Sequence, residues 1–232
     1  MKKILILFHI LISISLFAQI NIVSKKFFLD SLDRETTPKN YSYTRVITNY
    51  YQKSNRYLIT EYYKSGRKKM TGASLDKDIL KKDGEFVYYY KNGSKEAALN
   101  YSENHKIGKE FNWYENKDPK SEKENLWDAK TKISQTLILN FWDENKNQTV
   151  VEGNGEYEDT SGFITEKGVL KNGLKQGIWQ GNDTARRITF TENYDKGILL
   201  SGTSIDENNV KYSYSSLTEK QTGKKIPSKS IK

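Results

Sequence analysis

Short segments of nearly the same sequence recur along this chain, and this internal repetition constrains the fold more than any other feature. Residues 62–66 read Tyr-Tyr-Lys-Ser-Gly, and residues 89–93 read Tyr-Tyr-Lys-Asn-Gly. A looser copy, Trp-Tyr-Glu-Asn-Lys, occupies residues 113–117. Self-similarity with a period of about 20 to 50 residues is typical of arrays that repeat one small structural unit. We therefore predict an array of similar β-hairpins.

The repeated unit has the residue types of a strand followed by a tight turn. Phe86, Tyr88 and Tyr90 alternate along the segment 84–90, so a strand places them on one face. Aromatic side chains suit such a half-buried, pleated surface. The Asn-Gly pair at residues 92–93 then predicts a type I′ turn, because both residues tolerate the positive φ angles that this turn requires. The return strand is expected at residues 96–101.

The second half of the chain follows the same pattern. The opening Gly-x-aromatic of residues 84–86 recurs at residues 155–157 and 177–179, and Asn-Gly recurs at residues 172–173. Strands are also expected at residues 136–142 and 149–152, on either side of a turn. The predicted fold class is all-β, an elongated antiparallel meander of hairpin repeats.

Changes in composition predict the organisation along the chain. The stretch at residues 117–134 is highly charged and carries Pro119, so it is expected to connect two arrays, although Leu126 and Trp127 also fit a short strand. The expected segments are a signal peptide at 1–18, a lead-in segment at 19–40, an N-terminal array at 41–116, the charged connection at 117–134, a C-terminal array at 135–217 and a basic disordered tail at 218–232.

The first residues predict export. Lys2 and Lys3 precede an apolar run at residues 4–17, and Ala18 offers a small residue before a cleavage point. This order is typical of a secretory signal peptide, here expected to be helical. The alternative is a retained membrane anchor, but the run is shorter than the roughly 20 residues that span a bilayer. We expect a periplasmic or extracellular protein with no transmembrane span after cleavage.

Composition and charge exclude several classes of function. The chain has no cysteine, which excludes disulfides, thiolate metal sites and a lipid-modified cysteine. Its net charge of +9 is spread among alternating Lys, Glu and Asp residues, whereas nucleic-acid binding requires a clustered basic stripe, so no nucleic-acid partner is expected. Hydrophobic residues make up only 35% of the chain and tyrosine alone numbers 16, which favours a thin sheet with half-buried rings.

The combination of Gly-x-aromatic, paired aromatic residues and Asn-Gly, over residues 62–116 and 155–202, resembles the bacterial MORN-repeat variant family. Proteins of that family are often labelled as antitoxins. The resemblance implies MORN-like β-hairpin repeats and no catalytic residues. The order of export signal, Tyr-rich lead-in and repeats also resembles the extracytoplasmic repeat region of TonB-like energy transducers. The TonB C-terminal domain of those proteins is lacking here, so energy coupling is not implied.

No set of residues predicts an active site, a cofactor site or a metal site. His105 is the only histidine after the signal segment and is expected in a solvated turn, which leaves at most one base for nucleophilic catalysis. Residues 143–147 imitate the first half of a calcium loop, but Gln148 and Asn154 stand where its Gly and closing Glu belong, so a hairpin turn is expected. Glu156 and Glu158 are two residues apart on an expected strand and therefore share a face. Such a pair fits either the two carboxylates of a glycosidase or an ordinary solvated strand surface.

The aromatic ladder is the remaining candidate site. Tyr88, Tyr90, Trp113 and Tyr114 are a possible ligand face across neighbouring hairpins; the alternative is that they form the core, since repeats bury apolar positions against one another. We expect a non-enzymatic exported repeat protein that binds a protein or an envelope glycan, or has a structural role, without a cofactor. The alternative function is an antitoxin or immunity protein that neutralises a toxin by direct binding.

Overall fold

The computed structural model describes residues 23–222, which form one β-sheet and a short terminal helix. The expected signal peptide, its helix and the last ten residues of the expected tail lie outside these residues. The strands of the first half are β1 (Lys25–Leu29), β2 (Tyr43–Ile47), β3 (Tyr57–Tyr63), β4 (Lys68–Ser74), β5 (Gly84–Tyr89), β6 (Lys95–Ser102), β7 (His105–Trp113) and β8 (Pro119–Asp128). Those of the second half are β9 (Ile133–Trp142), β10 (Gln148–Val151), β11 (Asn154–Ser161), β12 (Ile164–Lys171), β13 (Leu174–Asp183), β14 (Ile188–Asp195), β15 (Ile198–Asp206) and β16 (Lys211–Tyr214), before the helix α1 (Leu217–Thr222).

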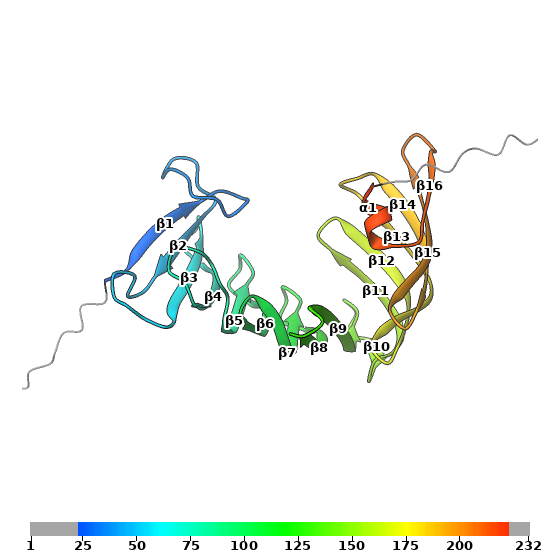
Figure 1. The fold of residues 1–232 in the computed structure, drawn as a ribbon, viewed down its shortest axis with the longest axis horizontal. Coiled ribbons are helices and arrows are strands. Elements are labelled where there is room, and N and C mark those ends of the chain that lie inside the picture. The colour runs from blue at the N-terminus through cyan, green and yellow to red at the C-terminus, as the bar shows by residue number, and fades with distance from the viewer. Residues whose placement is uncertain (1–22, 223–232) are drawn as a thin grey trace, which may run out of the picture.

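The sixteen strands follow one another in spatial order from β1 to β16, and every pair of neighbours is antiparallel. This arrangement confirms the predicted all-β meander of hairpins. The ribbon is open and bent, with β1–β4 and β11–β16 forming two arms that rise from a base of middle strands (Figure 1). We call the side between the arms the inner face and the opposite side the outer face.

The charged segment at residues 117–134 is a strand and not the expected connection. Most of it forms β8, which pairs with β7 on one side and with β9 on the other. The inner-face positions of β8 carry polar residues such as Ser121 and Asn125, which form hydrogen bonds to neighbouring strands. Because these neighbours satisfy the polar groups, a strand forms without apolar alternation. The lead-in likewise contributes β1, and the first residues of the expected tail form α1.

The turns differ in type between the two edges of the sheet. At Asn172 and Gly173 both φ angles are positive, 51° and 78°, as a type I′ turn requires. The turn at residues 91–93 is different, because only Gly93 has positive φ and the Asn92 side chain accepts a hydrogen bond from the Ser94 amide at 2.8 Å. The Asn-Gly pair therefore marks the predicted hairpin but not the predicted turn type. A three-residue loop with one left-handed residue forms instead.

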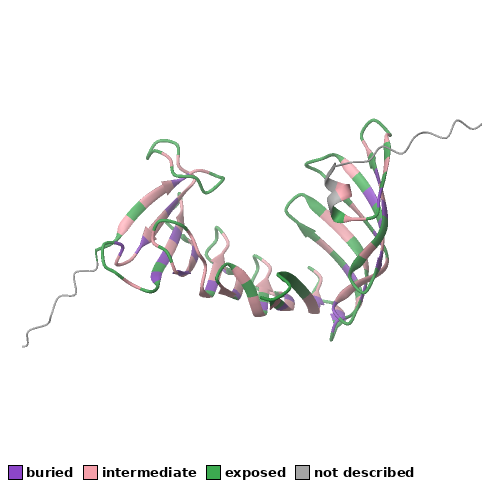
Figure 2. Cartoon of the chain, viewed as in Figure 1, coloured by how far each residue is buried: buried purple, intermediate pink, exposed green. Residues whose placement is uncertain are grey.

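The core on the inner face has two separate apolar clusters, and Figure 2 shows buried residues in both arms. One contains Phe86 and its neighbours from β2 to β6, and the other contains Trp179 and its neighbours from β9 to β14. Both side chains are completely buried. In each cluster a glycine of the preceding strand leaves room for the ring: an added Cβ on Gly72 or Gly168 would lie 2.5 Å from ring atoms of Phe86 or Trp179. The aromatic residues thus pack on bare backbone, which is how a single-layer sheet buries large rings.

A polar network separates the two clusters at the base of the bend. Glu110 is buried, and it occupies the position after Gly108 that Phe86 and Trp179 occupy after their own glycines. Its carboxylate accepts hydrogen bonds from Lys106 at 2.9 Å and from Asn125 at 3.0 Å. Burial alone would raise the pKa of Glu110, but the nearby ammonium groups of Lys123 and Lys106 lower it below its ordinary value.

Candidate binding groove

The sheet splits between β10 and β11, and the split forms the candidate site. β10 pairs with β11 at only two positions, Val150 with Gly155 and Val151 with Asn154. Beyond Gly155, the residues of β11 pair with β12 alone. The hairpin of β9 and β10 therefore diverges from the hairpin of β11 and β12.

Glycine geometry explains why the strands part. Gly155 has a φ of 142°, a backbone conformation that side chains disfavour, and a Cβ at this position would clash with the carbonyl oxygen of Thr149. At the opposite edge of the sheet the turns are held together: Gly173 N–H donates to Gly153 O at 2.8 Å, and Ile138 N–H donates to Gly173 O at 3.0 Å. The strands are thus pinned at one edge and splayed at the other.

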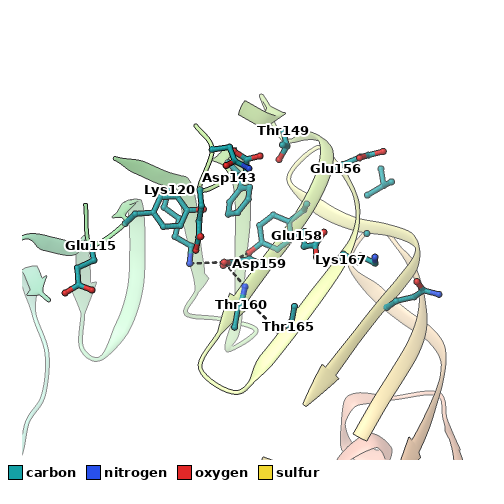
Figure 3. A pocket seen from close by; sticks show the side chains of 18 of the residues that line it. Glu115, Lys120, Asp143, Thr149, Glu156, Glu158, Asp159, Thr160, Thr165 and Lys167 are labelled. Carbon is teal, nitrogen blue, oxygen red and sulfur yellow. Dashed lines mark hydrogen bonds and ion pairs between the residues drawn. The ribbon is translucent and has the colours of Figure 1, made fainter. Parts of the chain in front are cut away.

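The splayed strands enclose a groove of about 1150 Å³. Tyr114, Phe141 and Tyr157 line it from the inner face, while Glu156, Glu158, Lys167 and other outer-face residues of β11 to β13 line it from the other side. Both faces contribute because the sheet is a single layer, so an opening between two strands passes through it. Figure 3 shows Lys120 of β8 and Asp159 of β11 pointing toward each other across the groove, with Glu156 and Lys167 on the other side of the β11–β12 ribbon.

One ion pair crosses the groove. Lys120 of β8 lies 2.8 Å from Asp159 of β11, and the Tyr157 hydroxyl donates to the other oxygen of the same carboxylate at 3.2 Å (Figure 3). Burial and the Asp159 charge both raise the pKa of Tyr157, which stays protonated. Within residues 23–222, five lining carboxylates, Glu115, Asp143, Glu144, Glu156 and Glu158, form no salt bridge. The groove is therefore acidic in a chain of net charge +9.

The four aromatic residues of the expected ligand face do not lie together. Tyr90 and Tyr114 line the groove, but their hydroxyls donate to the backbone oxygens of Trp113 and Trp142 at 2.8 and 2.7 Å. Burial raises the pKa of Tyr114 to about 12. Tyr88 instead packs against Phe86 and accepts a hydrogen bond from Lys82.

A shift of strand register explains this separation. The pairing slips between Tyr88 and Tyr89, and again between Asn112 and Trp113, so strict alternation is lost along the ladder. Trp113 contacts Phe111 and Lys95 outside the groove. The tyrosine hydroxyls that reach the next hairpin act as cross-links between repeats.

The other residues singled out in the sequence have separate positions. Glu156 and Glu158 are exposed and line the groove. Asp143 accepts hydrogen bonds from the backbone and side chain of Asn147, as expected of a hairpin turn. His105 begins β7 and stacks on Trp127 with ring centroids 3.5 Å apart, so it is not in a free turn.

Lys120, Asp159, Glu115 and Glu144 were not singled out in the sequence. They belong to segments that are far apart along the chain, and nothing in their local sequence marks them. Only the splay between β10 and β11 brings them to one groove.

Comparison with known proteins found no matching family, no matching curated protein and no matching solved structure. In the part of the chain that the structure describes, no helix is long and apolar enough to span a bilayer. The same residues contain no cluster of three acidic or histidine side chains able to hold a metal ion.

Proposed function

We propose that this chain is an exported, non-enzymatic MORN-like repeat protein that acts as a binding module at the cell envelope. The observation that carries the proposal is the groove between β10 and β11. Its unpaired carboxylates lie on a framework whose aromatic groups are already engaged in packing. A partner would therefore meet the groove walls, where Tyr90 and Tyr114 offer only ring surface because their hydroxyls are already hydrogen-bonded.

The buried aromatic residues and the bonded tyrosine hydroxyls act as scaffold, which supports this proposal. Phe86 and Trp179 are completely buried, and the Tyr90 and Tyr114 hydroxyls bond to the backbone of the next hairpin. These contacts hold the array rigid, as nearest-neighbour packing does in repeat proteins. A rigid scaffold presenting a pre-formed groove loses little conformational entropy on binding.

The chemistry of the groove supports binding more than catalysis. Asp159 is neutralised by Lys120, and Glu156 and Glu158 project from one strand into solvent. His105 lies on β7 against Trp127 and is not among the groove residues. The pair that the sequence singles out, Glu156 and Glu158, therefore lies on one strand, whereas a glycosidase places its two carboxyl groups on either side of the bond to be cleaved.

Site-specific photo-crosslinking in the native cell tests this proposal. A photoreactive amino acid is placed at Glu144 or Glu156 in the groove, and at Glu85 or Glu96 as matched exposed positions on β5 and β6. We expect a discrete adduct from the groove positions, in the envelope fraction, and none from the controls. Identical adducts from all four positions, or a chain recovered with the cytoplasm, would contradict the proposal.

The antitoxin or immunity role, which the MORN resemblance implies, would use the same groove. Its partner would be a toxin encoded beside this chain. The identity of the crosslinked protein distinguishes the two roles, because a toxin partner must also lose toxicity when this chain is co-expressed.

A further inference from the structure

Part of the β11 edge is left without a partner strand inside the groove. Ser161 and Ile164 form the last pair of the β11–β12 hairpin, on either side of a two-residue turn, so their backbone groups point toward each other. Because hydrogen-bonded and non-hydrogen-bonded pairs alternate, the N–H and C=O groups of Glu158 point away from β12. They face the side on which β10 has already diverged.

Unpaired backbone groups of this kind are a template for another strand. Native proteins usually cover a sheet edge or shorten it, because an open edge pairs readily with other chains. The backbone at Glu158 is instead held open in the middle of a sheet, by the conformation of Gly155 and by the pinned turns at the opposite edge. Further along this edge, the Thr160 N–H already donates to the Asp159 carboxylate at 2.8 Å. A strand that enters here gains backbone hydrogen bonds at Glu158, beside the Lys120–Asp159 ion pair that crosses the groove.

The charges around the edge select the kind of strand. Glu156 and Glu158 lie on the outer face of the edge, and Glu115 and Glu144 lie across the groove. Asp159 is paired with Lys120 on the inner side, at 2.8 Å. Carboxylates on both walls attract Lys and Arg side chains and repel an acidic segment.

A further polar group in the wall lacks a partner. The Thr149 hydroxyl is shielded from solvent and forms no hydrogen bond among the described residues. Thr149 borders the groove at the point where β10 and β11 part (Figure 3). An enclosed hydroxyl without a partner is unusual in a folded protein and is consistent with a site that a ligand completes.

We propose that a basic, extended segment of a partner protein adds to the β11 edge as an additional strand. Its backbone pairs with Glu158, and Lys or Arg at every second position faces Glu156 and Glu158, since alternate side chains of a strand share one face. This inference rests on the proposed binding function and adds the chemistry of the partner and the mode of its recognition.

The experiment measures binding of synthetic decapeptides to the full chain by fluorescence anisotropy, with amide exchange followed by NMR. The first probe alternates Lys and Thr, the second replaces Lys by Glu, and the third is the Lys-Thr peptide with alternate backbone amides N-methylated. We expect salt-sensitive binding of the first probe only. We also expect at least about ten-fold slower exchange of the Glu158 amide when that peptide is bound.

A matched pair of variants tests the charges. Glu156→Gln with Glu158→Gln should weaken Lys-Thr binding about ten-fold, as the loss of two solvent-screened ion pairs predicts. Glu85→Gln with Glu96→Gln removes two exposed carboxylates of β5 and β6 and should leave binding unchanged. Circular dichroism checks that both variants fold.

Equal binding of the N-methylated and unmodified peptides would overturn strand addition, as would no binding of the Lys-Thr peptide or unchanged exchange at Glu158. These failures would leave the proposed binding function standing if groove crosslinks are still observed. Absence of groove crosslinks would instead contradict the function itself, so the two failures are distinguishable.

Discussion

The packing of the Trp179 ring on Gly168 leads to a prediction with two parts. Gly168→Ala should destabilise the natural chain but stabilise a chain that lacks the indole ring. A Cβ on Gly168 would lie 2.5–2.6 Å from three ring atoms of Trp179, about 1 Å closer than carbon atoms normally approach. The ring has no free direction, because it is completely buried with Tyr157 and Tyr194 at centroid distances of 5.7 and 6.4 Å. Gly168→Ala should therefore lower the free energy of unfolding by about 1–3 kcal/mol, as overpacking does.

The same substitution should stabilise a chain in which the ring is absent. In Trp179→Leu the space next to Gly168 is no longer filled by an indole, and Ala restricts the unfolded chain more than Gly does. Gly168→Ala in that background should raise the free energy of unfolding by about 0.4–1 kcal/mol. The coupling energy between the two sites is then about 1.4–4 kcal/mol, the sum of the two effects, which overlaps the range for residues in contact.

Urea unfolding followed by circular dichroism measures the four stabilities of this cycle. Because an elongated array need not unfold in one step, hydrogen exchange by mass spectrometry locates the effect. Faster exchange should be confined to β11–β15 and spare β2–β6, whose own pair is Gly72 and Phe86. Equal destabilisation by Gly168→Ala in both backgrounds would refute the argument, since the ring contact would not be the cause.

Three further predictions concern the base of the bend and the groove. Glu110→Gln should make the free energy of unfolding depend less on pH under acidic conditions. The lowered pKa of the Glu110 carboxyl stabilises the folded chain above pH 4.5, its ordinary value, and this stabilisation is lost as the pH falls; urea midpoints between pH 3 and 7 measure the loss. Tyr114→Phe should reduce alkaline unfolding between about pH 10 and 12. Because the pKa of Tyr114 is raised to about 12 in the folded chain, the free energy of unfolding falls as the pH rises through that window; a pH titration of the circular dichroism signal measures the unfolded fraction. Gly155→Ala should cost about 1–3 kcal/mol in thermal or urea unfolding, since its φ of 142° suits glycine and its Cβ would clash with the Thr149 carbonyl; full stability in this variant would contradict the account of the split.

Local sequence patterns are sufficient to predict the hairpin meander. Alternating aromatic residues and Asn-Gly pairs are short-range signals, and each acts within one hairpin. The prediction was wrong for residues 117–134, because β8 has polar inner-face residues and lacks the apolar alternation that marks a strand. Its place in the sheet depends on Glu110 and Asn112 of β7, which accept and donate hydrogen bonds across the strands.

The candidate site residues were only partly predictable, because the groove also depends on contacts between strands that local patterns do not show. Glu156 and Glu158 stand out as a pair two residues apart, and both line the groove. Lys120 and Asp159 form their ion pair from strands that are not adjacent in the sheet, so no sequence spacing reveals it. The grouping of Tyr88 with Tyr90 assumed uninterrupted alternation, which a register shift removes.

The sequence by itself determined the repeat unit, the antiparallel hairpins and the positions of most turns, because these depend on interactions between residues close together in the chain. The tertiary structure decided where the sheet bends, which tyrosine hydroxyls link neighbouring repeats, and where β10 and β11 separate. Those features arise from contacts between one hairpin and the next: the clash that only glycine avoids at position 155, and the stacking of the turns at Gly153 and Gly173. Such contacts have no local signature, since each requires the array to be formed before its partners meet.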